Sequence, residues 1–150
     1  MSARFRSVLV VDDSTDGREM LSEYLRFRGF VVSEAVDGQE AIDRALRDVP
    51  SIILMDLSMP GISGAEATRR IKAHPMTQHI PVIAVTAQAF VHQQANARDA
   101  GCDGLVVKPF DLVLLADALD RIIEHGVAAW NDSDPRPSSP HNTPRTLRSA

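Results

Sequence analysis

Cysteine and long apolar runs are scarce in this chain of 150 residues. The single cysteine, Cys102, excludes an intrachain disulfide framework and fits a reducing compartment. No apolar run approaches the length of a membrane span. The apolar stretch that follows Arg4 and Arg6 covers only 8–11, too short for the core of a signal peptide. These absences predict a cytoplasmic protein that does not bind membranes.

Clustered basic charge and nucleotide-binding motifs are also missing. The net charge of −4 argues against nucleic-acid binding, because phosphate contacts need grouped Lys and Arg. Neither G-x-x-x-x-G-K-[ST] nor G-x-G-x-x-G occurs. The five histidines show no pairing four residues apart, so a zinc site is not expected. A hydrophobic fraction of 44% is ordinary for one globular domain.

Five short apolar runs alternate with helical patterns. The runs predict strands at 8–11, 31–35, 52–56, 81–85 and 105–107, and helices are predicted between and after them. This alternation predicts an α/β fold with a doubly wound, five-stranded parallel sheet. Residues 131–150 hold four of the nine prolines and no apolar periodicity, so we expect a folded domain at 1–130 and a disordered tail at 131–150.

Several helix starts carry capping signals. An acidic or hydroxyl residue precedes a glutamate by three positions in Asp16-x-x-Glu19, in 37–40 and in Ser63-x-x-Glu66. Asp111 is expected to cap the last helix, which has the cleanest apolar stripe. The helix at 90–100 has a weak apolar face, so we expect it to be loosely held and available to a partner.

Polar side chains follow four of the predicted strands. Asp12 and Asp13 end the first, Asp56 the third, Thr86 the fourth and Lys108 the fifth. With strand order 2-1-3-4-5, the first and third strands are neighbours at the topological switch point, and the three carboxylates converge there. Each residue taken singly is equally compatible with a turn, a helix cap or a surface position. The joint pattern favours a site.

Three carboxylates in one crevice cannot all stay ionised unaided: either the pKa of one of them rises or a cation lies among them. Hard oxygen ligands favour Mg²⁺, and a backbone carbonyl near Ser58 could complete its shell. Lys108 and Thr86 suit an anionic group, through a charge-assisted contact and a hydroxyl hydrogen bond. This equipment fits phosphoryl transfer to a carboxylate, with Asp56 as the nucleophile.

The residues quoted above resemble the receiver domain of bacterial two-component response regulators, specifically the stand-alone type. The similarity covers about residues 6–125 and includes a flavodoxin-like fold. Thr86 and Lys108 lie 30 and 52 positions after Asp56, as in that family. The matching segments are Asp12-Asp13, 55–64, Thr86-Ala87 and Lys108-Pro109-Phe110.

The resemblance implies a role for each matching residue. Asp56 would accept a phosphoryl group from a sensor histidine kinase or a histidine phosphotransfer protein. Asp13, Asp56 and the Ser58 carbonyl would hold Mg²⁺ or Mn²⁺, with Asp12 acting through metal-bound water. On the other side of the pocket, Lys108 and the Ala87 backbone would contact phosphate, Thr86 would act as the switch, and the Lys108–Pro109 bond would be cis.

One position departs from the family. Leu105 stands three residues before Lys108, where Tyr or Phe is usual, which places the aromatic switch readout in question. We therefore expect a signalling module, not an enzyme, whose output is relay of phosphate or binding of a downstream protein through 90–125, as a monomer or weak dimer. Two alternatives stay open: a phosphorylation-independent scaffold, and a Mg²⁺-dependent phosphatase. The phosphatase is disfavoured because Ser58 occupies the position of the required second carboxylate.

Overall fold

Strands and helices alternate along the chain in this computed structural model, which describes residues 6–87, 91–130 and 145–146. The parallel strands are β1 (Ser7–Val11), β2 (Val31–Ala35), β3 (Ile52–Asp56), β4 (Val82–Thr86) and β5 (Gly104–Val107). The helices are α1 (Thr15–Phe27), α2 (Gly38–Asp48), α3 (Gly64–Ala73), α4 (Val91–Ala100) and α5 (Leu112–His125). A 3₁₀ turn, η1 (Val127–Ala129), and a short strand, β6 (Arg145–Thr146), complete the described elements.

The sheet confirms the predicted architecture and adds one strand to it. The order is β2-β1-β3-β4-β5-β6, in which β1 to β5 run parallel in the predicted order 2-1-3-4-5. β6 pairs antiparallel with β5 and was not predicted. Apart from Arg145–Thr146, the tail predicted at 131–150 lies outside the described residues, as does Phe90 at the predicted start of the fourth helix.

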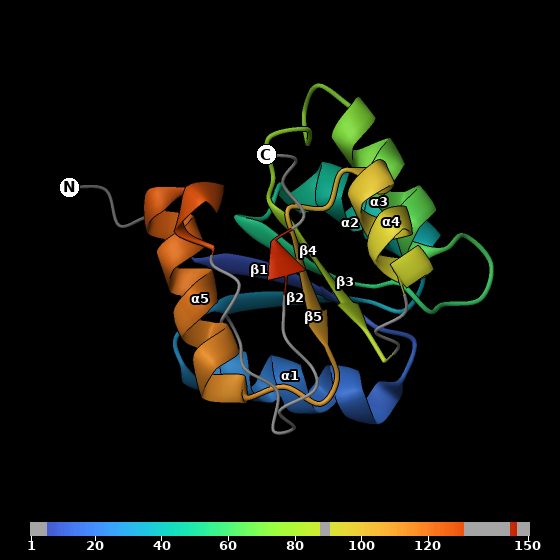
Figure 1. The fold of residues 1–150 in the computed structure, drawn as a ribbon. Helices are drawn as coiled ribbons and strands as arrows, with labels where there is room; N and C mark the ends of the chain where they lie inside the picture. Colours follow the sequence, from blue (N-terminus) through green and yellow to red (C-terminus); the bar gives the residue numbers. More distant parts are fainter. Residues whose placement is uncertain (1–5, 88–90, 131–144, 147–150) are drawn as a thin grey trace.

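Helices cover both faces of the sheet (Figure 1). Successive side chains of a strand point to opposite faces, so each buried strand supplies two cores. Leu9 and Ile53 pack with residues of α2, α3 and α4, whereas Val10 and Leu54 pack with residues of α1 and α5. Every residue of β3 is buried, as its apolar sequence predicts for the centre of a parallel sheet. None of the described helices is both long enough and apolar enough to cross a bilayer.

Three of the four predicted helix caps are confirmed. The side chains of Asp37, Ser63 and Asp111 accept hydrogen bonds from the amides three residues further on. The predicted cap at Asp16 is wrong, because the chain enters α1 earlier and the Ser14 hydroxyl accepts from the Gly17 amide at 3.4 Å. Asp16 lies in the first turn instead, where the helix dipole favours an acidic side chain.

Asp111 caps the start of α5, directly after the loop that carries Lys108. A substitution of Asp111 tests how much this cap contributes to the stability of the fold. Asp111 Oδ1 accepts from the Leu114 amide at 3.0 Å. We expect Asp111→Ala to lower the free energy of unfolding by about 1 kcal/mol in urea titrations. Asp111→Asn keeps an acceptor in the same place and is the matched control. An equal loss in both variants would show that charge, and not capping, is what stabilises this turn.

Candidate functional site

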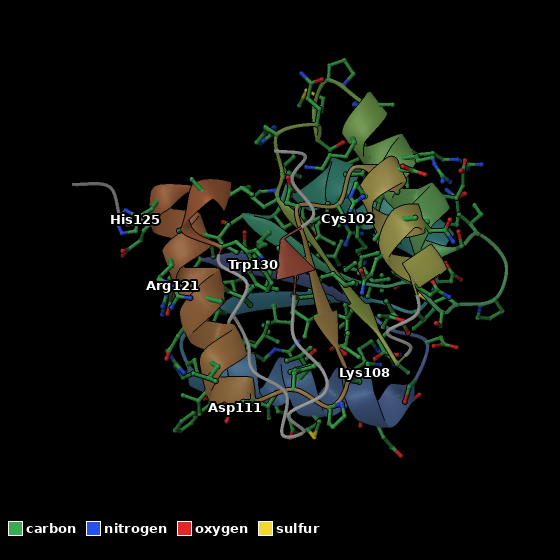
Figure 2. All side chains as sticks on the ribbon, viewed as in Figure 1. Cys102, Lys108, Asp111, Arg121, His125 and Trp130 are labelled. Atoms are coloured by element: carbon green, nitrogen blue, oxygen red, sulfur yellow. The ribbon has the colours of Figure 1, made fainter. Side chains whose placement is uncertain are left out.

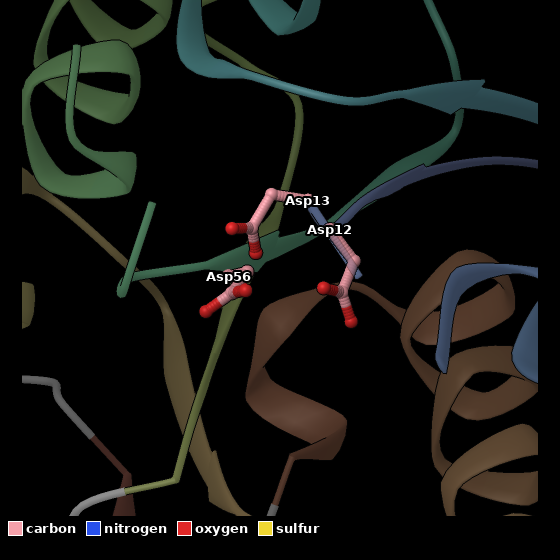
Figure 3. Close-up of side chains that lie close together, drawn as sticks. All are labelled: Asp12, Asp13 and Asp56. Carbon is pink, nitrogen blue, oxygen red and sulfur yellow. The ribbon is translucent and has the colours of Figure 1, made fainter. Parts of the chain in front are cut away.

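The carboxyl ends of β1 and β3 lie side by side and bring three aspartates together (Figure 3). One carboxylate oxygen from each of Asp12, Asp13 and Asp56 lies within 4.8 Å of the other two. The register explains this proximity, since Val11 of β1 pairs with Met55 of β3 and the aspartates follow directly. The predicted convergence of the three side chains is confirmed.

The backbone fixes two of the carboxylates and leaves the third facing solvent. Asp56 is only 5% exposed, and its Oδ1 accepts a hydrogen bond of 2.9 Å from the Ser58 amide. Asp12 is 7% exposed, and its Oδ1 accepts one of 2.8 Å from the Ser14 amide. Asp13 is exposed. Two carboxylates are thus held in place at the bottom of the site, with one at its rim.

Burial makes Asp56 a weaker acid than an ordinary aspartic acid. Removal from water raises the pKa of its carboxyl from 3.8 to about 6, and the neighbouring Asp12 adds to that rise. The Ser58 amide and the Lys108 ammonium act in the opposite direction without cancelling it. The three clustered carboxylates outnumber the Lys108 ammonium beside them, so ionisation of Asp56 leaves the site with a net negative charge that favours a cation.

The donor set fits a divalent hard cation. It consists of carboxylate oxygens from two strand ends, with no sulfur or imidazole among the three clustered residues. Mg²⁺ is bound in proteins by one or a few carboxylates together with water, and the exposed Asp13 leaves the site open to water. Ser58 lies beside Asp56, which it contacts through its amide. The role of the Ser58 carbonyl as a ligand stays a prediction.

Lys108 reaches the same site from the end of β5. Its Nζ lies 3.2 Å from Asp12 Oδ2, and the side chain is labelled at the carboxyl edge of the sheet in Figure 2. The Lys108–Pro109 bond is cis, as the family resemblance implied. Sequence analysis predicted a lysine facing an anion but missed that Asp12 is its partner here.

Thr86 and Ala87 sit at the end of β4, next to the lysine. Thr86 is fully buried, and its carbonyl accepts a 2.8 Å hydrogen bond from the Lys108 amide. Ala87 is exposed. Leu105, at the position that departs from the family, is 1% exposed and pairs in register with Ala84 of β4. The structure thus places the predicted polar site residues at or directly after the carboxyl ends of their strands, whereas Leu105 lies inside β5.

Sequence analysis missed residues that contact the site aspartates without belonging to the predicted site. Arg18 Nη1 donates to the Asp12 carbonyl at 2.9 Å, and Arg18 Nε donates to Glu34 at 3.2 Å. A Cβ on Gly17 would lie 3.2 Å from Asp12 Oδ2, and one on Gly64 would lie 2.0 Å from the Asp56 carbonyl oxygen. A single glycine at a helix start gives no signal of such proximity in sequence.

A cavity of about 320 Å³ adjoins the carboxylates on the side of α1 and α5. Asp12, Asp56 and Lys108 contribute its polar lining. The remaining lining is mostly apolar and includes Val10, Leu21, Leu54, Val85, Pro109, Phe110 and Leu112. Asp56 is therefore almost fully buried and also borders this cavity.

Comparisons with known proteins point to one family. The sequence pattern of the family described as response regulator receiver domain matches residues 8–120. The response regulator PleD of Caulobacter vibrioides is 39% identical over 115 residues, covering 77% of this chain and 25% of PleD. The chemotaxis protein CheY-3 of Vibrio cholerae is 35% identical over 118 residues, covering 78% of this chain and 91% of CheY-3. The chain thus spans a quarter of one relative and nearly all of the other.

A solved structure gives the same result. The receiver domain of the sensor histidine kinase PA1611 from Pseudomonas aeruginosa superposes with a TM-score of 0.75 at 33% identity. The match covers 79% of this chain and 98% of that one. That structure is described with a magnesium ion coordinated in its active site cleft.

Proposed function

Since this chain belongs to the response regulator receiver domain family, we propose that Asp56 accepts a phosphoryl group from a phosphohistidine on a sensor histidine kinase or a histidine phosphotransfer protein. The observation that carries this proposal is the group of three carboxylates, with oxygens within 4.8 Å of one another, and the Lys108 ammonium beside them. In this proposal Asp56 is the nucleophile, and Asp12 and Asp13 are the acidic pair that binds a metal ion. The Lys108 ammonium is the positive charge that contacts the phosphoryl oxygens.

The proposal includes a divalent cation, Mg²⁺ or Mn²⁺. Asp12, Asp13 and Asp56, with the Ser58 carbonyl, are the residues that would hold it, Asp12 through an intervening water. When bound, the cation supplies positive charge that neutralises the phosphoryl oxygens. The description of the PA1611 receiver with magnesium in its cleft supports this choice of ligand.

The chemical step uses residues of this chain in separate roles. Ionised Asp56 attacks phosphorus in line and forms an acyl phosphate; the nitrogen–phosphorus bond breaks, and its electron pair returns to the imidazole of the donor. Because the pKa of Asp56 is about 6, most of the carboxyl is ionised and nucleophilic above pH 7. Lys108 contacts the transferred group and leaves its 3.2 Å contact with Asp12 to do so. The Thr86 hydroxyl and the Ala87 amide complete the anion contacts.

The output we propose is a change in protein binding. Phosphorylation of Asp56 biases a two-state equilibrium of the face formed by 90–125, which binds a downstream protein in the cytoplasm or passes the phosphoryl group on. Leu105 is already buried, so a rotation that buries an exposed aromatic ring is not the readout. Turnover of external phosphoesters is not proposed, because Ser58 offers no carboxylate two residues after the nucleophile.

Intact-mass measurement after incubation with acetyl phosphate tests this function. We expect the chain to gain the mass of one phosphoryl group with Mg²⁺ present and none after chelation with EDTA. Steady release of phosphate from a small phosphoester would instead support the phosphatase. No mass gain under any condition would refute the proposal and favour a scaffold that works without phosphate.

A further inference from the structure

β5 is the outermost of the parallel strands, and no charged residue of its own protects that edge. Its four residues, Gly104-Leu105-Val106-Val107, are all buried and include no charge. Unpaired edges of this kind promote pairing with another chain, and proteins protect them with charges or with a covering segment. The opposite edge, β2, has such protection: Glu34 contacts Arg18 at 3.2 Å and Arg26 at 3.3 Å.

β6 covers the β5 edge. Arg145 pairs in register with Leu105, and Thr146 pairs with Gly104, in antiparallel orientation. Figure 1 shows this short red strand against the orange β5. β6 is the outermost strand of the sheet. Its residues, 145–146, lie well after the segment that matches the family, 8–120.

A second contact brings the chain after α5 to the same strand. Gly126, at φ 85°, ends α5 and leads into η1, and Trp130, which follows η1, is only 4% exposed. A Cβ on Gly104 would lie 2.9 Å from the Trp130 indole, so the indole packs where this glycine has no side chain. Two separate segments, at 130 and at 145–146, thus meet β5 at Gly104.

We propose that the chain's own β6 acts as a resident blocking strand on the β5 edge, which prevents a second copy of this chain from pairing there. Two copies of an apolar edge strand can pair antiparallel about a two-fold axis, which gives a self-complementary contact. β6 occupies the same backbone groups within one molecule. This inference goes beyond the proposed phosphotransfer and does not depend on it.

The test uses the full chain with Arg145→Pro and Thr146→Pro together. Proline has no amide hydrogen, so this variant loses every backbone N–H that β6 can donate to β5, and we expect the pairing to be lost. We expect hydrogen exchange at the β5 amides that face away from β4 to become faster by about tenfold or more. In sedimentation velocity at increasing protein concentration, the parent stays monomeric and the proline variant self-associates.

Two control variants separate backbone pairing from side-chain effects. Arg145→Lys with Thr146→Val keeps both amides and the positive charge, and Arg145→Gln removes only the charge; both are expected to behave as the parent does. Unchanged β5 exchange in the proline variant would overturn the pairing itself. Faster exchange with a monomer at every concentration would overturn the blocking role. A far-UV circular dichroism spectrum that equals the parent's verifies that the variant is folded.

Discussion

Asp56→Asn is expected to take up no phosphoryl group from acetyl phosphate and, without metal, to be more stable than the parent at neutral pH. The amide cannot act as the nucleophile, so the mass gain is lost completely. Its side-chain oxygen can still accept from the Ser58 amide, which bonds the carboxylate at 2.9 Å. The substitution therefore removes a buried charge while it keeps the hydrogen bond.

The stability gain depends on pH in a defined direction. The folded-state pKa of Asp56 is raised from 3.8 to about 6, so the folded chain holds this proton more tightly than the unfolded chain does. Stability is then lost as pH rises from about 4 through 6, where half of the carboxyl is ionised in the folded state, and the loss levels off above about pH 7. We expect Asp56→Asn to gain about 3 kcal/mol at pH 7.5 and much less at pH 4, measured by urea unfolding with EDTA.

Asp43→Asn is the matched control for this experiment. Asp43 lies exposed on α2, where it accepts from Gln39 at 3.1 Å, so its neutralisation is expected to change stability by less than about 0.5 kcal/mol. Millimolar Mg²⁺ is expected to narrow the difference between parent and Asp56→Asn, because a cation stabilises the ionised site of the parent. A variant that is no more stable than the parent at pH 7.5 would contradict the raised pKa of Asp56 in the folded chain.

Gly64→Ala, which adds one methyl group beside the site, is expected to destabilise the fold strongly. Its Cβ would lie 2.0 Å from the Asp56 carbonyl oxygen and 2.9 Å from the Asp56 carbonyl carbon. These are backbone atoms of a fully buried strand, so they cannot move aside as a flexible side chain would. We expect a loss of about 3 kcal/mol or more in unfolding free energy, together with slower phosphorylation of Asp56.

Ala65→Gly separates this effect from helix propensity. This variant removes a methyl group from the next residue of α3, whereas Gly64→Ala adds one. Inside a helix, glycine lowers the stability by at most about 1 kcal/mol relative to alanine. Both variants are measured by urea unfolding and by acetyl phosphate labelling. A Gly64→Ala loss no larger than that of Ala65→Gly would show that α3 can shift away from the strand without consequence.

The site could be predicted from sequence because its residues follow the rules of a parallel sheet. Apolar runs marked the strands, and the polar residue after each run had to lie at one shared edge. Asp56 follows an unbroken run of four apolar residues, and all of β3 is indeed buried. Caps at Asp37, Ser63 and Asp111 were predictable because a side-chain acceptor and the amide three residues later are local in sequence.

What the sequence did not reveal depends on contacts across the fold. The Asp12–Lys108 pair joins β1 to β5, which are separated by two strands, and only the length of the lysine side chain lets it form. The start of α1 was misplaced because Ser14 and Asp16 are both good caps, and the Asp12 carboxylate selects Ser14 by accepting from its amide. β6 has two residues in a proline-rich stretch, too few to produce a periodic signal.

The burial of Trp130 against Gly104 gives this protein a natural optical probe. It is the only tryptophan in the chain, so selective excitation of indole reports on this one contact and on nothing else. Among the described residues its Nε1 has no hydrogen-bond partner, so water that enters here on detachment supplies one and shifts the emission to longer wavelength. The packing of the chain against its outermost parallel strand can thus be followed in real time, without a label.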